Sequence, residues 1–163
     1  MLARLAKSEA PSIYSTMLLS EFQFAHAKLL EAMAELDTLT RGALPSTDRV
    51  VNARWNISRA SLTRRTLWNR ALPELLLGAS AVEANDLRRL KDSDRALLRS
   101  SSEHVCRWSI AAVMSDWPGY CAASQDIRWK MKAAIGAEQR VIYPLLNPPI
   151  RPCFGESPVR LAG

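Results

Sequence analysis

The stretch FQFAHAKLLEAMAEL, from Phe22 to Leu36, decides the fold predicted for this chain. Its apolar positions recur at alternating steps of four and three residues, the spacing of one helix face that packs into a bundle. A helix is therefore predicted from about Ser12 to Leu39. The residues that share its inward face are Phe22, His26, Leu29, Met33 and Leu36.

Two more helices are predicted on either side of a polar connection. One runs from about Asp48 to Leu72, and Pro73 is expected to end or kink it. Its apolar face is the least clear of all. The segment Gly78–Asp94 is interpreted as a connection that holds at most a short helix. The next long helix is predicted to start at Ser93 or Asp94, either of which can cap it, and to end at Asp116.

A last helix is predicted from about Gly119 to Tyr143, with Pro144 as its stop. Polar residues fall on the inward faces of the third and fourth long helices, where a buried polar group needs a partner. His104 shares its face with Leu97, Ser101, Trp108 and Ala111. Glu138 shares its face with Ile127, Met131, Ala134, Val141 and Leu145.

Four amphipathic helices with short connections predict an all-α, up-down-up-down four-helix bundle. The length of 163 residues and the hydrophobic content of 48% suit a single core. We assign residues 1–146 to this domain and residues 147–163 to a Pro-rich C-terminal tail. No apolar run is long enough to span a bilayer and the N-terminus lacks the pattern of a signal peptide, so a cytoplasmic location is expected.

The basic residues point only weakly to a partner. The net charge is +6, and no acid interrupts the segment between Arg49 and Pro73. The arginines of this segment scatter around the helix, whereas a nucleic-acid footprint needs them on one face. Solvated surface, or pairing with acids on neighbouring helices, is the simpler interpretation. The arginines are Arg49, Arg54, Arg59, Arg64, Arg65 and Arg70.

Other residue classes indicate no catalytic chemistry. Cys106, Cys121 and Cys153 have no metal-binding spacing and are expected to be reduced and mostly buried. The run Ser101–His104 is not a catalytic triad, because neighbours on a helix point in different directions. The tryptophans are expected to serve core and helix-cap packing: Trp55, Trp68, Trp108, Trp117 and Trp129.

Three sequence stretches resemble hemerythrin-like (HHE cation-binding) domains: FQFAHAKLLEAMAEL around His26, SSEHVCRW around His104 and AIGAEQRVIYPLL around Glu138. Such domains carry a His on the first helix and another on the third. The second and fourth helices each carry His-x-x-x-Glu, closed by Leu-x-Pro or Leu-Tyr-Pro. The resemblance covers about residues 13–146, and it implies a four-helix bundle whose core holds two irons.

Aligning the prolines shows which of the family's ligand positions are kept. His26, His104 and Glu138 match, whereas Thr63, Leu67 and Ala134 occupy positions of lost ligands. Two neighbouring irons need bridging carboxylates and several imidazoles, so an intact di-iron centre is disfavoured. The favoured interpretation is no cofactor, with a buried hydrogen-bonded network instead. In that network Glu138 accepts from a histidine or pairs with Arg59 or Arg70.

Two alternatives keep a cofactor. Two histidines and one carboxylate also form the ligand set of a single iron or zinc ion. The two histidines could instead ligate a haem, although no sequence feature marks a haem pocket.

The sequence therefore predicts a non-enzymatic, hemerythrin-like domain with a degenerate metal site, serving as a regulatory or protein-interaction scaffold. Its protein partner is unknown, and self-association into a homo-oligomer is also open. One alternative is a mononuclear metal-binding or oxygen- or redox-sensing protein that uses His26, His104 and Glu138. Another is Arg-mediated binding of an acidic partner or nucleic acid. No membrane partner is expected.

Overall fold

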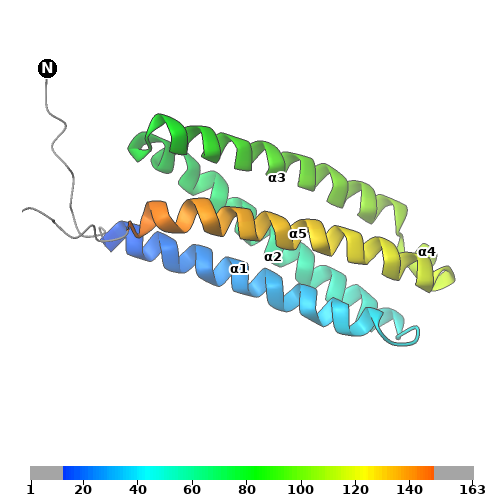
Figure 1. Ribbon diagram of the computed structural model, residues 1–163. Helices are drawn as coiled ribbons and strands as arrows, with labels where there is room; N and C mark the ends of the chain where they lie inside the picture. Colours follow the sequence, from blue (N-terminus) through cyan, green and yellow to red (C-terminus); the bar gives the residue numbers. More distant parts are fainter. Residues whose placement is uncertain (1–12, 149–163) are drawn as a thin grey trace, which may run out of the picture.

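The computed structural model describes residues 13–148, which form helices and contain no strand (Figure 1). The all-α prediction is therefore confirmed for this part of the chain. The elements are α1 (Ile13–Thr40), α2 (Thr47–Gly78), α3 (Ala81–Arg107), α4 (Ile110–Ser115) and α5 (Trp117–Leu146). None of these helices is both long and apolar enough to cross a membrane.

The four long helices lie side by side, and the short α4 lies at one end between α3 and α5 (Figure 1). α1 packs against α2 and α5. α3 packs mainly against α5 and more lightly against α2. The seam between α2 and α3 is thus the loosest of the four.

The inward face predicted for α1 is confirmed. Leu29 and Met33 are almost completely buried, as are Phe22, His26 and Leu36. The predicted boundaries of this helix, Ser12 and Leu39, each differ by one residue from the observed ones. The 4-3-4-3 pattern worked here because α1 has one buried face and one solvated face.

The predicted end of the second helix is wrong, because α2 continues through Pro73 to Gly78. A proline inside a helix removes one backbone hydrogen bond and costs about 3 kcal/mol. Burial of apolar side chains on both sides of it opposes that cost: Ala71 is fully buried, and Leu75 and Leu76 pack against the core.

The polar connection predicted between Gly78 and Asp94 is also wrong, since α3 begins at Ala81. Ser80 and Glu83 form a capping box: the Ser80 amide donates to the Glu83 carboxylate (2.7 Å), and the Glu83 amide donates to the Ser80 hydroxyl (3.4 Å). The S-x-x-E pattern was present in the sequence as the signal for this start. Ser93 instead lies exposed in the middle of α3, and Asp94 is buried there.

The third helix also ends earlier than the predicted Asp116. It stops at Arg107, and the short α4 follows with Ser109 as its cap, whose hydroxyl accepts from the Ala112 amide. Asp116 caps α5 by accepting from the Gly119 amide (2.9 Å). Pro144 does not stop α5, which continues to Leu146.

The core consists of two apolar clusters with a layer of buried polar residues between them. One cluster contains Leu29, Ile57 and Ile135, and the other contains Phe22, Leu67 and Ile142. His26, Arg64 and Glu138 lie between these positions along α1, α2 and α5, and all three are buried. The inward face predicted for His26 and Glu138 is thus confirmed.

Two groups of side chains differ from expectation. Trp55 and Trp129 are exposed, although Trp68, Trp108 and Trp117 are buried as predicted. Cys106 is exposed and Cys121 is only half-buried, so the expected burial of the thiols is wrong for Cys106. Cys153 and nearly all of the predicted tail, residues 149–163, lie outside the described residues.

Candidate functional site

The buried layer begins with a direct contact between His26 on α1 and Glu138 on α5. The His26 Nε2 and Glu138 Oε2 atoms are 2.9 Å apart, and the two residues are only 1% and 2% exposed. An ionised carboxylate can only accept, so the imidazole donates from Nε2. The structure therefore brings two of the three candidate residues together.

Arg64 on α2 supplies the guanidinium cation of this layer. Its Nη1 atom donates to the second oxygen of Glu138, and its Nη2 atom donates to Asp94 Oδ1 on α3 at 2.6 Å. Burial tends to lower the pKa of the Arg64 guanidinium, but the charges and hydrogen bonds of Glu138 and Asp94 outweigh burial and raise it. Arg64 therefore remains a cation that holds two carboxylates from different helices.

Tyr143 closes the network on the side of α5. Its hydroxyl is 2.8 Å from His26 Nδ1, and the two rings are stacked with centroids 5.8 Å apart. In the tautomer that donates from Nε2 and carries no proton on Nδ1, the Tyr143 hydroxyl donates to Nδ1. Burial raises the pKa of Tyr143, which keeps its proton available for this bond. The chain of contacts thus links four helices through Tyr143, His26, Glu138, Arg64 and Asp94.

His104 does not join this network. It is half-buried on α3, and its ring lies 5.8 Å from that of Tyr120 on α5. Burial, together with the charges of Arg54 and Arg128, lowers the pKa of His104. Tyr120 belongs to the apolar cluster on the far side of the polar layer from Phe22, which contacts His26. The two histidines are therefore in different parts of the core.

The three positions at which the resemblance leads one to expect further ligands carry ordinary structural residues. Thr63 is exposed, and its hydroxyl donates to the Arg59 carbonyl at 3.1 Å. Leu67 is buried in an apolar cluster, and Ala134 is half-buried.

The sequence suggested that Arg59 or Arg70 pairs with Glu138. This prediction is wrong, because Arg64 is the arginine that pairs with it. Arg70 instead forms an ion pair with Glu21 on the surface. Sequence reasoning also missed Asp94 and Tyr143. A signal for Arg64 was present, because it continues a 4-3-4-3-4 series of inward positions on α2: Ala53, Ile57, Ala60, Arg64, Leu67 and Ala71.

The side chains of this layer do not fit a metal centre as they are arranged. Both oxygens of Glu138 are engaged, one by His26 and one by the cationic Arg64. Within residues 13–148, no group of three or more His, Cys, Asp or Glu side chains is placed to hold a metal ion. A guanidinium occupies the position where a cation would need to meet the carboxylate.

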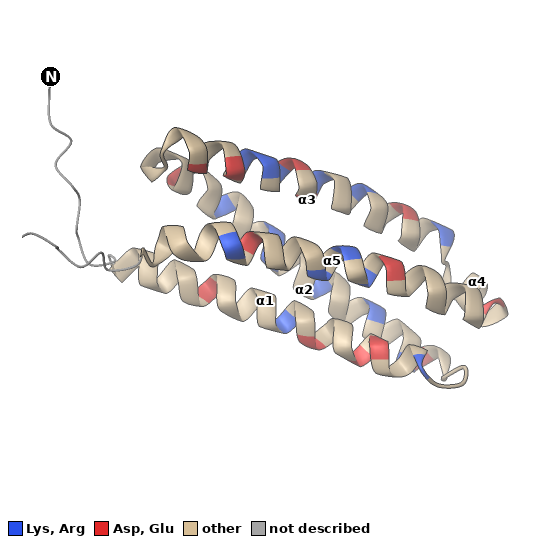
Figure 2. Ribbon diagram, viewed as in Figure 1, with Lys and Arg blue, Asp and Glu red and all other residues tan. Residues whose placement is uncertain are grey.

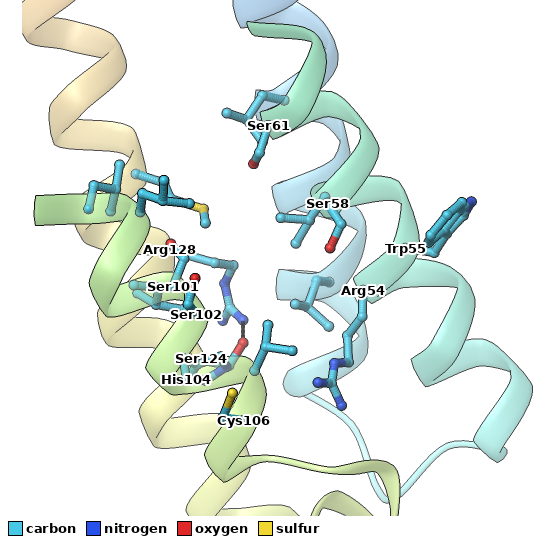
Figure 3. Close-up of a pocket in the computed structure, with 18 of the residues that line it drawn as sticks. Arg54, Trp55, Ser58, Ser61, Ser101, Ser102, His104, Cys106, Ser124 and Arg128 are labelled. Carbon is cyan, nitrogen blue, oxygen red and sulfur yellow. Dashed lines mark hydrogen bonds between the residues drawn. The ribbon is translucent and has the colours of Figure 1, made fainter. Parts of the chain in front are cut away.

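A pocket of about 650 Å³ adjoins the layer between α2, α3 and α5. Figure 3 shows serines from all three helices lining it, with Arg54 directed into the gap and Trp55 pointing away. Arg128 is buried at its wall, where it donates to Ser124 (2.5 Å) and forms an ion pair with Asp37 on α1 (3.3 Å). His104 lines the pocket rather than the polar layer.

Comparison of the chain with protein-family models, with curated proteins and with solved structures finds no match in any of the three. Lys and Arg lie on every long helix (Figure 2), and acidic residues are distributed among them.

Proposed function

We propose that this chain is a non-catalytic, hemerythrin-like four-helix bundle in which an internal ion-pair network has replaced the metal centre. Its role is that of a regulatory or protein-interaction scaffold. The observation that carries the proposal is Arg64, which is buried between Glu138 and Asp94. A cation is needed to balance carboxylates in a buried site, and here a side chain supplies it.

The arrangement of the helices supports the proposal. Four long helices with short connections suit an up-down-up-down bundle. His26 and Glu138 face each other across its core, as the first- and fourth-helix ligands of that family would. The cross-links between helices hold one packing register without a metal.

The surface supplies groups that suit contact with a protein partner. Phe24, Trp55 and Trp129 stand on the outside of the helices and are each more than 60% exposed. Aromatic side chains are enriched at protein interfaces because they bury large areas with few rotatable bonds. The same residues would serve a second copy of this chain.

The test is metal content and metal response of the protein purified without a His tag. We expect no stoichiometric iron or zinc, and a melting temperature that neither chelator nor added metal ion changes. Both oxygens of Glu138 are already engaged, so this carboxylate has no free oxygen for a metal to bind.

Two outcomes would contradict the proposal. One metal per chain, lost in His26→Ala, would favour the mononuclear alternative. Two irons per chain with oxo-bridge absorption would restore a redox function.

A further inference from the structure

The inner wall of the pocket between α2 and α3 is built from a polar stripe on α2. Arg54, Ser58, Ser61 and Arg65 follow a 4-3-4 spacing and all line the pocket. This spacing places them on one helix face, where a packed bundle would carry apolar residues. The stripe therefore faces a pocket that α3 leaves open.

Several donors on this wall have no partner. Arg54 Nη1, Arg64 Nε and Arg65 Nε are buried atoms without a hydrogen-bond acceptor among the described residues, and Arg64 itself is only 3% exposed. Buried donors in proteins are normally satisfied. All three belong to cations, and an acceptor that also carries negative charge forms the strongest hydrogen bond to such a donor.

The distribution of charge along the α2 stripe favours Arg54 as the residue that meets the acidic group of a ligand. Within residues 13–148, neither Arg54 nor Arg65 forms an ion pair. Arg65 is next to Arg64, whose single charge is shared by the carboxylates of Glu138 and Asp94, so the potential there is offset. At the other end Arg54 lies over the Tyr120 ring at 5.8 Å, near His104 and Arg128. The positive charge of Arg54 is therefore the uncompensated one.

Apolar side chains from four helices also line the pocket. They include Leu29, Ile57, Leu97, Ile127 and Met131. A volume of about 650 Å³ lies in the range of small-molecule sites. An apolar body can fill it while an acidic group reaches Arg54.

We infer that the pocket between α2, α3 and α5 binds a small amphipathic carboxylate, a free fatty acid of medium chain length, with its carboxylate on Arg54. The arginine forms a charge-assisted hydrogen bond to the carboxylate. The alkyl chain covers the apolar wall between α2 and α3. Arg64 and Asp94 belong to both the pocket lining and the ion-pair network, but Arg54 is not part of that network. The contact between the carboxylate and Arg54 can therefore be tested whether or not the core binds metal.

The experiment titrates the full chain with decanoate below its micelle concentration, by calorimetry and by melting temperature. We expect saturable binding of one decanoate per chain and a rise in melting temperature. Arg54→Met should weaken binding at least about tenfold, because it removes the charged contact and keeps the side-chain length. Arg49→Met, an exposed arginine of the same helix outside the pocket, is the matched control and should bind as the parent does.

A second variant and two further probes keep the inference open to refutation. Ser58→Phe places a ring in the pocket at an exposed position and should block decanoate while leaving Arg54 intact. The neutral analogue 1-decanol should bind much more weakly than decanoate. The protein should not bind anionic phosphatidylglycerol vesicles, because the proposed ligand is a free fatty acid and not the headgroup of a membrane lipid.

The inference would be overturned if decanoate did not bind at about 1 mM, a concentration well above the dissociation constant expected for a ligand of such a pocket. It would equally be overturned by decanol binding as tightly as decanoate, by Arg49→Met and Arg54→Met losing affinity equally, or by tight binding to vesicles. None of these outcomes bears on the metal test.

Discussion

At the residue scale, Arg64 has the largest structural role of any single side chain in the described segment. It is buried, it lies on α2, and it holds carboxylates from α5 and α3. A buried ion pair is not by itself strongly stabilising, because desolvation of the charges offsets their attraction. Its consequence is that removing one member leaves the others buried and unpaired.

Arg64→Met should therefore lower the free energy of unfolding by about 3–5 kcal/mol, measured by urea denaturation. Arg59→Met, an exposed arginine on the same helix, should change it by less than about 0.5 kcal/mol. Adding Glu138→Gln and Asp94→Asn to Arg64→Met should recover part of the loss, because the orphaned charges are gone. Equal losses in Arg64→Met and Arg59→Met would show that the network is solvated and not structural.

His104 gives the protein a pH dependence whose sign follows from its surroundings. Burial, with the charges of Arg54 and Arg128, lowers the pKa of His104 in the folded state below its ordinary 6.5. The unfolded chain then binds the proton more readily than the folded one. The contribution of neutral His104 to the free energy of unfolding should be fully present above pH 6.5. It should decline as the pH falls below that value toward the pKa of His104 in the folded state.

The measurement compares urea midpoints at about pH 7.5 and 5.5, on either side of the ordinary His pKa. The parent should lose more stability between these values than His104→Gln, which cannot titrate there. A pH difference of the same size in both proteins would assign the effect to other groups.

At the element scale, side-chain caps mark the beginnings of α3, α4 and α5. Ser80 and Glu83 satisfy each other's backbone amides at the start of α3, and Asp116 accepts from the Gly119 amide at the start of α5. Hydrogen bonds with Ser80 also lower the pKa of Glu83. The prolines at 73 and 144 have less influence than their intrinsic cost suggests, because Ala71 near the first and Ile142 and Leu146 near the second are buried.

Ser80→Ala should destabilise the protein by about 1 kcal/mol through loss of the cap. Ser93→Ala is the matched control on the same helix. Ser93 is exposed in mid-helix, so its replacement should be neutral within about 0.5 kcal/mol or slightly stabilising. Thermal or urea unfolding of both variants measures the two changes in the free energy of unfolding. If Ser93→Ala were the more damaging change, α3 would begin near the position that the sequence first suggested.

At the scale of the whole molecule, the polar layer and the pocket share one origin. α2 carries two inward faces, one toward the core with Arg64 and one toward α3 with Arg54 and Arg65. The second face is polar, so α3 cannot pack closely on it and rests mainly on α5. The least clear helix pattern in the sequence is thus the one that borders a pocket.

The sequence by itself determined the all-α class, the full inward face of α1, and the inward positions of His26 and Glu138. Each depends on local periodicity, which a single helix displays without reference to its neighbours. The capping pattern of Ser80 and Glu83 that starts α3 is also local, although the start was predicted at Ser93 or Asp94. The helix ends predicted at the prolines were wrong, because burial of neighbouring side chains against other helices offsets the local cost of proline.

Only the tertiary structure decided which buried polar groups meet. Arg64, Asp94 and Glu138 are far apart in the chain, and their pairing depends on the relative rotation and register of three helices. The same register separates His104 from His26 and assigns it to the pocket instead. Periodicity tells which side of a helix is buried, but it does not tell which residue of another helix lies opposite, because that depends on packing among all of them.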